Sequence, residues 1–413
     1  MARTSLIPLI LAVCTLGGPW ARGADWPQFH GPNRDNISTE TGLLKQWPAE
    51  GPKLLWTAQG LGHGFSAVAI ANGLVYVTGN VGPDTLITAL DLDGKVKWTA
   101  KNGPAWTREH VGTRSTPTID GGRLYHENAD GDLACLDAAT GKPVWSLNIL
   151  KKFNGRGITW GLAESLLIDG DRLICVPGGE EIGIVALSKL TGETVWMARG
   201  IGEKPGYSSP IVVEHQGLRL IVALMAKALV GVNADTGEFL WKVEHTTPFD
   251  ESIFLPLHHN GHIYFATAHA RGSRLLRLNV DGKKCSVQLV WSSEKLDSHH
   301  GGVVLLDGYL YGFCHGNYKP RWDCLDFATG KLMHSERTAT TGSVTYADGM
   351  IYAMDERGAV MLIRPTPDKR QVVSEFQLPK GGRGPTWAHP VVCGGRLYLR
   401  HGDFLYAYAV RAE

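Results

Sequence analysis

One nine-residue phrase recurs along the chain, and it constrains the fold more than any other feature of the sequence. It runs from Asp137 to Trp145 and returns from Ser188 to Trp196 and from Asn233 to Trp241, each time with Thr-Gly in the middle. A version one residue shorter spans Asp91–Trp98, and Asp326 begins a copy without the final Trp. A period of about 48 residues is typical of propellers and solenoids, in which one supersecondary unit buries its faces only against neighbouring units.

Each copy is preceded by the same order of signals, which predicts four short strands. Apolar stretches alternate with Gly-centred turns, and an alternating segment such as Leu133–Asp137 comes directly before the phrase. Short strands separated by Gly, Asp and Asn turns form antiparallel meanders. Eight first strands can be counted, beginning near Ser66, Ser115, Ala163, Ser208, Phe254, Gly301, Gly342 and Ala388. We therefore predict an all-β fold, an eight-bladed β-propeller of four-stranded antiparallel blades. Seven blades are the alternative, because the sixth and seventh copies lack the closing Trp.

The two ends of the chain are expected to close the ring together. The last blade has three strands of its own, and Lys53–Trp56 has the signature of an outer strand without strands before it. Placing this segment beside Tyr406 would complete the blade and remove exposed sheet edges. We therefore assign residues 1–23 to a signal peptide, 24–52 to an N-terminal arm extended over the ring, and 53–413 to the propeller.

The first 23 residues have the features of a secretory signal. Arg3 precedes an apolar run from Leu6 to Leu16, and Ala21 and Gly23 flank a cleavage site of the small-x-small type. A lipoprotein anchor at Cys14 is the alternative. After residue 23 the sequence has no run of about 20 apolar residues of the kind that spans a membrane. We therefore expect an exported protein, periplasmic or extracellular. We also expect it to be a monomer. The 41 basic and 40 acidic residues leave no basic field that would attract nucleic acid.

The cysteines that follow the signal segment are widely spaced, with neither adjacent pairs nor a CxxC motif. This spacing gives no support to zinc-ribbon, haem-attachment or thioredoxin-like sites. Cys314 and Cys324 could meet across one hairpin, and export permits a disulfide there. Buried free thiols that pack as small apolar residues are the other interpretation.

The repeats resemble the pyrroloquinoline-quinone-like (PQQ-like) propeller family over essentially all of residues 53–413. The matching segments are Ala89–Trp98, Cys135–Trp145, Ala186–Trp196 and Gly231–Trp241, and the leader Asp25–Arg34 is similar to the mature start of exported propellers of this class. The family includes quinoprotein dehydrogenases and non-enzymatic exported proteins such as the outer-membrane protein assembly factor. The dehydrogenases stack their quinone on a ring formed by adjacent cysteines, and hold calcium with Glu and Asn beside a catalytic Asp. This chain has no adjacent cysteines and no recognisable equivalent of that calcium set, so it resembles the non-enzymatic propellers more.

Loops that enter the first strands of a propeller cluster around its axis at one face, where ligands commonly bind. Alignment of the blades predicts a ring of eight positions there: Phe65, Arg114, Leu162, Tyr207, Ile253, His300, Thr341 and Trp387. Arg114, Tyr207, His300 and Trp387 could contact a polar or anionic ligand. Packing against neighbouring blades is the other interpretation of these four residues.

Histidine is the second feature of this face. Further ligand-binding candidates predicted there are His63, His110, Trp160, His299 and His389, while His269 and His315 lie in loops that open on the same side. Imidazoles are metal ligands and general bases near neutral pH. Separate blades could thus hold a transition metal, with His63, His299 and His300 as the candidate ligands. No HxH or HExxH motif supports this site, and adjacent histidines on a strand would diverge, so solvated or core histidines are the other interpretation.

These features together predict a non-catalytic exported propeller that binds a protein or a glycan at the axial funnel. Two enzymatic alternatives stay open: a quinoprotein-like dehydrogenase that uses PQQ with calcium, and a His- or metal-dependent enzyme that acts on acidic carbohydrate. Flat Trp faces suit sugar rings, and basic loop residues such as Arg108 and Arg156 would add positive potential. No catalytic residue can be assigned from the sequence.

Overall fold

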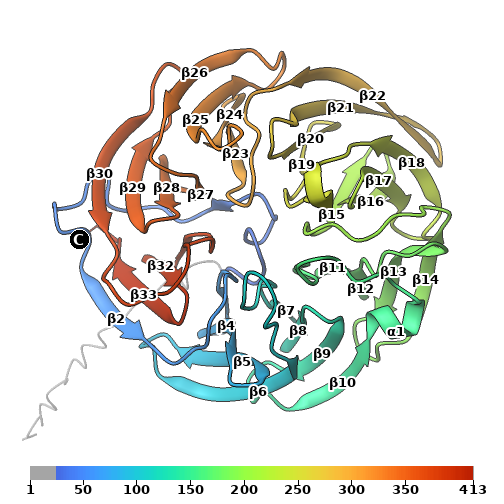
Figure 1. Ribbon diagram of the computed structural model, residues 1–413, viewed down its shortest axis with the longest axis horizontal. Coiled ribbons are helices and arrows are strands. Elements are labelled where there is room, and N and C mark those ends of the chain that lie inside the picture. Colours follow the sequence, from blue (N-terminus) through green and yellow to red (C-terminus); the bar gives the residue numbers. More distant parts are fainter. Residues whose placement is uncertain (1–24, 413) are drawn as a thin grey trace, which may run out of the picture.

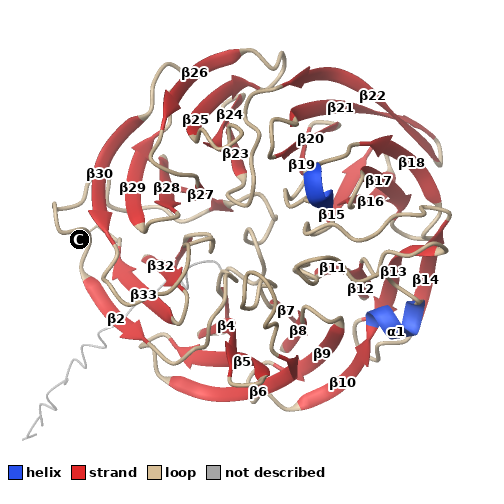
Figure 2. Cartoon of the chain, in the orientation of Figure 1, coloured by secondary structure: helices blue, strands red, loops and turns tan. Residues whose placement is uncertain are grey.

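The computed structural model describes residues 25–412, so the predicted signal peptide and the alternative anchor at Cys14 lie outside the described residues. The described chain forms eight sheets arranged radially around a central axis (Figure 1). Its helical segments are the short α1 (Ile149–Phe153) and the 3-10 turn η1 (Pro248–Asp250) (Figure 2). The prediction of eight four-stranded blades is confirmed, and the seven-bladed alternative is wrong. Between residues 25 and 412, no helix has the length and apolarity that a membrane crossing requires.

Seven blades take their four strands in chain order, each an antiparallel meander that runs from the axis to the rim (Figure 1). Blades 1 and 2 comprise β3 (Ala69–Ala71), β4 (Leu74–Val81), β5 (Asp84–Asp91) and β6 (Val96–Pro104), then β7 (Thr118–Asp120), β8 (Arg123–Glu127), β9 (Asp132–Asp137) and β10 (Pro143–Asn148). Blades 3 and 4 comprise β11 (Leu167–Asp169), β12 (Arg172–Cys175), β13 (Ile182–Ser188) and β14 (Thr194–Arg199), then β15 (Ile211–His215), β16 (Leu218–Leu224), β17 (Ala228–Asn233) and β18 (Phe239–Glu244). Blades 5 and 6 comprise β19 (Leu257–His259), β20 (His262–Thr267), β21 (Gly272–Asp281) and β22 (Lys284–Ser293), then β23 (Val303–Leu306), β24 (Tyr309–Cys314), β25 (Arg321–Asp326) and β26 (Leu332–Arg337). Blade 7 comprises β27 (Gly342–Ala347), β28 (Met350–Asp355), β29 (Ala359–Arg364) and β30 (Gln371–Gln377).

Blade 8 is shared between the two ends of the chain. It contains β31 (Val391–Cys393), β32 (Arg396–His401) and β33 (Phe404–Ala409), with β2 (Leu54–Ala58) as its outer strand. In β2, Trp56 lies opposite Ala407 and Thr57 lies opposite Tyr406, and Figure 1 shows the blue β2 beside the red β33. The predicted closure of the ring by an N-terminal strand is therefore confirmed.

The repeated phrase forms the turn between the third and fourth strands. In blade 2, the Asp137 carboxylate accepts hydrogen bonds from the backbone N–H of Thr140 (2.9 Å) and from its hydroxyl (2.6 Å). Gly141 follows with a φ of +72°, a conformation that only Gly adopts without steric cost. This local chemistry explains why Asp, Thr and Gly recur at fixed positions.

At five junctions of the ring, a Trp of the outer strand docks one blade onto the next one. The Trp98 ring lies directly on Gly141 of the following blade, where an added Cβ would come within 2.5 Å of the ring. The Trp98 Nε1 donates a hydrogen bond to the carbonyl of Ala138 (3.1 Å). The same pairing of ring and glycine recurs at Trp56–Gly94, Trp145–Gly192, Trp196–Gly237 and Trp291–Gly330. Five junctions between successive blades thus share one repeated contact.

Blade 7 lacks such a Trp, and the N-terminal arm supplies one from outside the repeat. Trp47 is buried, its backbone N–H donates to the Ser374 hydroxyl (2.8 Å), and its ring packs against Tyr352 and Phe376 at 5.7 and 5.6 Å between centroids. The same core cluster contains residues of blade 8, including Tyr408. The missing Trp therefore does not leave a gap between blades 7 and 8.

The rest of the arm lies at the centre of the ring, against inner strands of the blades (Figure 1). Trp26 exchanges two backbone hydrogen bonds with Ile70 of blade 1, and β1 (Ile37–Ser38) pairs in parallel with β27 of blade 7. Arg34 donates to the carbonyls of Ser165 (2.7 Å) and Leu166 (3.0 Å) near blade 3. The innermost strands leave backbone groups unpaired towards the axis, and buried groups of this kind require partners. The arm provides such partners in blades 1, 3 and 7.

Cys314 and Cys324 are both buried free thiols. Across the hairpin, Cys314 lies opposite Arg321 and Cys324 opposite Tyr311, so the two sulfur atoms are not directly paired. The disulfide alternative is not formed in this structure.

Candidate functional site

A cavity of about 130 Å³ lies at the axis of the ring. Six of the eight ring positions predicted from the blade alignment line it: Phe65, Arg114, Tyr207, Ile253, His300 and Trp387. Leu162 instead joins a hydrophobic core cluster, and its neighbour Ala163 reaches the cavity. Thr341 is not part of the lining. The alignment therefore located the cavity, with errors at two blades.

Eight of the nine predicted ligand-binding candidates line this cavity, namely Arg114, Tyr207, His300, Trp387, His110, Trp160, His299 and His389. His63 is the exception. Its ring packs edge-on against Phe65 at 5.3 Å, and it faces the backbone at Gly384 and Gly402. The structure thus brings together candidates from the loops of five blades, whereas His63 is not part of the lining.

Five aromatic rings form a continuous arc along the wall, which we call the aromatic belt: Phe65, Trp387, His110, Trp160 and Tyr207. Successive ring centroids lie 4.7, 5.3, 5.7 and 5.5 Å apart, within the range of favourable aromatic pairs. Both indole N–H groups are already engaged, because Trp160 donates to Glu109 (2.9 Å) and Trp387 donates to Glu356 (2.8 Å). These hydrogen bonds fix the two largest rings of the belt.

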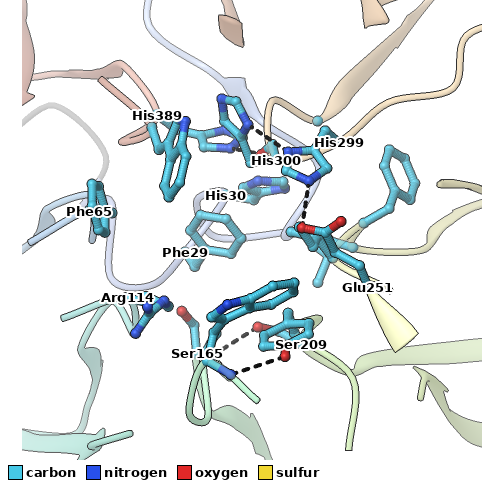
Figure 3. Close-up of a pocket in the computed structure, with 18 of the residues that line it drawn as sticks. Phe29, His30, Phe65, Arg114, Ser165, Ser209, Glu251, His299, His300 and His389 are labelled. Atoms are coloured by element: carbon cyan, nitrogen blue, oxygen red, sulfur yellow. Dashed lines mark hydrogen bonds and ion pairs between the residues drawn. The ribbon is translucent and has the colours of Figure 1, made fainter. Parts of the chain in front are cut away.

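The centre of the site comes from the N-terminal arm, which the blade alignment did not include. Figure 3 shows Phe29 and His30 between the Arg114 side and the His299 side of the pocket. The His30 and His389 rings lie 4.6 Å apart, and the Asn36 amide is 3.3 and 3.4 Å from their ring nitrogens. The sequence did contain a signal for this part of the site, because the leader Asp25–Arg34 is rich in aromatic residues and lies outside the repeats. No periodicity, however, could place it at the axis.

Arg114 is the cationic group of the cavity wall. Its guanidinium donates to the backbone carbonyls of Gly112 (3.3 Å) and His110 (2.7 Å). Burial lowers the Arg114 pKa to about 10, so it remains charged at neutral pH. No carboxylate forms an ion pair with it within residues 25–412. A partly desolvated cation without a counter-charge favours an anionic group on whatever enters the cavity.

The opposite side of the cavity carries three histidines. Burial lowers the pKa of His300 well below its usual value and that of His389 to about 4, so both rings are uncharged at pH 7. The His300 Nε2 is buried and has no hydrogen-bond partner, while its Nδ1 lies 3.2 Å from the Nδ1 of His299. The expectation that these two side chains diverge is wrong, because both lie in the loop before β23 and not on a strand.

The proposed metal trio of His63, His299 and His300 is not assembled. The structure instead brings Glu251, His269 and His299 together, with one ligand atom from each within 4.8 Å of the others. His269 and His315 lie in loops between second and third strands, as predicted, with ring centroids 4.7 Å apart. Burial opposes ionisation of Glu251, but hydrogen bonds and charges from His299 and His269 outweigh it and lower the Glu251 pKa. Nothing in its local sequence had singled out Glu251.

The basic loop residues Arg108 and Arg156 add less positive electrostatic potential to this face than the sequence analysis predicted. Arg108 lies 3.7 Å from the Asp130 carboxylate, and Arg156 pairs with Glu180. Both Arg side chains therefore have counter-charges on the same face.

The residues of this cavity do not fit a quinone with calcium. Calcium takes six to eight oxygen ligands, whereas imidazole nitrogens suit transition metals. Among the described residues that line the cavity, Glu251 is the only carboxylate, and both of its oxygens face imidazoles. The arm residues Phe29 and His30 also occupy the centre of the pocket, where a flat tricyclic group would need space. The residues of the cavity therefore fit neither calcium nor the quinone.

Comparison with known proteins agrees with this architecture. The family model described as outer membrane protein assembly factor BamB matches residues 33–181 and 103–332, which together form most of the chain. The assembly factor BamB of Yersinia pestis is 20% identical over 267 residues, covering 60% of this chain and 63% of that protein. The chain spans less than two thirds of the length of the curated relatives it matches.

Solved structures share the fold at low sequence identity. BamB from Moraxella catarrhalis superposes with a TM-score of 0.61 at 15% identity, covering 87% of this chain and 98% of that one. The quinohemoprotein alcohol dehydrogenase of Comamonas testosteroni gives 0.66 at 13% identity, covering 95% and 81%. These likenesses show the propeller fold alone. The family model, in contrast, matches most of the sequence, and a match of this extent shows family membership. The chain therefore belongs to the PQQ-like propeller family whose model is described as outer membrane protein assembly factor BamB.

Proposed function

We propose that this chain is a non-catalytic, exported binding propeller whose axial cavity takes an exposed protein segment bearing an aromatic side chain beside a carboxylate. The aromatic belt carries this proposal. Its five rings come from separate loops and form one arc with centroid separations between 4.7 and 5.7 Å. Closure of the propeller requires no such arc, whereas aromatic rings of a partner gain stabilisation from it beyond simple burial.

The polar groups of the cavity favour a protein side chain over a sugar. A sugar needs many free donors and acceptors for its hydroxyl groups, and most of those here are engaged. The Tyr207 hydroxyl accepts from the Trp160 backbone N–H (3.2 Å), and the Ser165 and Ser209 hydroxyls accept from backbone N–H groups. Arg114 retains donors and lacks a counter-charge, which supports a carboxylate on the bound segment.

Family membership supports the same class of function and a place in the cell envelope. The family model that matches this chain is described as outer membrane protein assembly factor BamB, a description that fits binding of protein segments. The apolar export signal predicted for residues 1–23 is in accord with that location.

The proposal is tested with fluorescein-labelled hexapeptides that contain Trp-Asp, Ala-Asp or Trp-Asn at their centre, titrated with the mature protein by fluorescence anisotropy. We expect the Trp-Asp peptide to bind at least about tenfold more tightly than either other peptide, which corresponds to about 1.4 kcal/mol for each recognised group. Trp387→Ala should remove the preference for Trp, and Arg114→Gln the preference for Asp. Trp98→Phe, which alters a ring on the outer strand β6, serves as the matched control and should bind like the wild type.

Three outcomes would contradict the proposal. Equal binding of the three peptides would exclude recognition of the ring and the carboxylate. Preferential binding of uronate oligosaccharides in the same assay would assign the cavity to glycans. Dye-linked alcohol oxidation after addition of PQQ and calcium would assign the chain to the dehydrogenases.

A further inference from the structure

A second constellation lies at one side of the axial cavity, and its chemistry differs from that of the aromatic belt. Glu251 follows η1, His269 lies between β20 and β21, and His299 lies between β22 and β23. A carboxylate oxygen of Glu251 lies 3.0 Å from the His299 Nε2, and its other oxygen contacts the His269 Nε2. One ligand atom from each of the three residues lies within 4.8 Å of the other two. Figure 3 shows Glu251 and His299 facing each other at the edge of the pocket.

A third imidazole stands beside this group. The His315 ring centroid lies 4.7 Å from that of His269 and 5.6 Å from that of His299. The His315 Nδ1 is buried and makes no hydrogen bond to any described residue. An unpartnered buried nitrogen beside two imidazoles and a carboxylate is an unfavourable arrangement without a further group to bind it.

The surrounding structure holds the ligand loops in place. The buried carboxylate of Asp297 accepts from the backbone N–H of Ala270 (3.2 Å) and from that of Gly316 (2.9 Å), so one side chain ties the His269 loop to the His315 loop. His269 itself has a φ of +61°, a left-handed conformation that residues other than Gly adopt uncommonly. Strained residues of this kind persist where the surrounding structure determines them, and they cluster at functional sites.

A chain of polar contacts leads from this group to the aromatic belt. The His299 Nδ1 lies 3.2 Å from the His300 Nδ1, which is 4.0 Å from the carboxylate of Glu356. Glu356 in turn accepts from the indole of Trp387. Metal-binding histidines usually have such a partner on the ring nitrogen that faces away from the ion, because it fixes the orientation of the ring.

We infer that Glu251, His269 and His299, with His315 as a fourth donor, form a binding site for a first-row divalent transition metal such as zinc. Three imidazole nitrogens and one carboxylate oxygen match the donor set of zinc, and nitrogen donors disfavour calcium and magnesium. The ion would lie in the cavity wall, since Glu251 and His299 both line the cavity. This inference does not rest on the proposed peptide binding, because the ion is tested without any other ligand.

The test uses the mature full-length protein, stripped with a chelator and titrated with zinc chloride by isothermal calorimetry. We expect one zinc ion per chain with a dissociation constant of about 1 µM or below, and no heat with calcium. His299→Ala and the double variant His269→Ala/His299→Ala should weaken zinc binding by at least about 100-fold. Cobalt provides a second readout, since visible absorption bands typical of nitrogen-rich coordination should appear in the wild type and disappear in the double variant.

The matched control is another group of imidazoles in the same molecule. His215, His258, His259 and His262 gather at the hairpins of blades 4 and 5, with His259 exposed. The double variant His259→Ala/His262→Ala should keep wild-type zinc binding. Loss of binding in this control, unchanged binding in His269→Ala/His299→Ala, or wild-type zinc binding weaker than about 100 µM would each overturn the inference. The cobalt spectrum of the wild type decides the matter if a histidine variant fails to fold.

Discussion

The contact between Trp98 and Gly141 gives a quantitative prediction about how the blades hold together. A Trp side chain buries about 150 Å² when packed, which at about 25 cal/mol per Å² corresponds to at most about 4 kcal/mol. Trp98 is half-buried, so we expect Trp98→Ala to lower the free energy of unfolding by about 2 kcal/mol. Trp98→Phe should cost only about 0.5 kcal/mol, because the ring is kept and the carbonyl of Ala138 still accepts from the Tyr76 hydroxyl (3.2 Å).

Substitution of the glycine separates ring contact from backbone strain. Gly141→Ala places a methyl group 2.5 Å from the Trp98 ring and also puts Ala at a φ of +72°. In the wild type both effects should destabilise the protein, whereas in Trp98→Ala only the backbone strain of roughly 1–2 kcal/mol should remain. The two substitutions should therefore be non-additive, as expected for residues in direct contact.

Urea denaturation followed by circular dichroism measures these differences as shifts of the midpoint. Val96→Ala, at a position on the same strand that is 53% exposed, is the control and should change stability by less than about 0.5 kcal/mol. Equal losses in Trp98→Phe and Trp98→Ala would show that the hydrogen bond, and not the ring, joins the blades. Strict additivity of Trp98→Ala and Gly141→Ala would refute the docking contact altogether.

Two further predictions concern the arm and the buried acids. Burial raises the pKa of Glu164 to about 8, against the opposing effects of the Val176 N–H and Arg34. The folded-state pKa of Glu164 exceeds the unfolded value, so its stabilisation is present below about pH 4.5 and is lost as the pH rises through about 8, by up to about 5 kcal/mol. Glu164→Gln should flatten this decline in unfolding free energies measured from pH 5 to 8.5, and an unchanged slope would contradict the assignment. Trp47→Ala should destabilise the protein by about 3–5 kcal/mol, the usual cost of removing a buried Trp, in the same urea assay. A cost below about 0.5 kcal/mol would show that the arm does not replace the missing Trp of blade 7.

The candidate site was predictable only where it follows the repeat. Arg114, Tyr207 and Trp387 occupy equivalent positions in different blades, so an alignment of blades was sufficient to place them on one cavity wall. Glu251 and His30 occupy no repeat position. Their neighbours come from other loops and from the arm, and pairings of this kind depend on distances that the sequence does not contain.

The sequence by itself determined the closed eight-bladed architecture, because turn chemistry and strand alternation act over a few residues and repeat with the blade. It also determined that β2 completes the last blade, since one isolated outer-strand signature matched one incomplete blade. Only the tertiary structure decided that the arm lies at the centre of the ring, that Trp47 serves blade 7, and that Glu251, His269 and His299 converge. These contacts join segments far apart in the chain, and their energies depend on burial and geometry that exist only after the ring has closed.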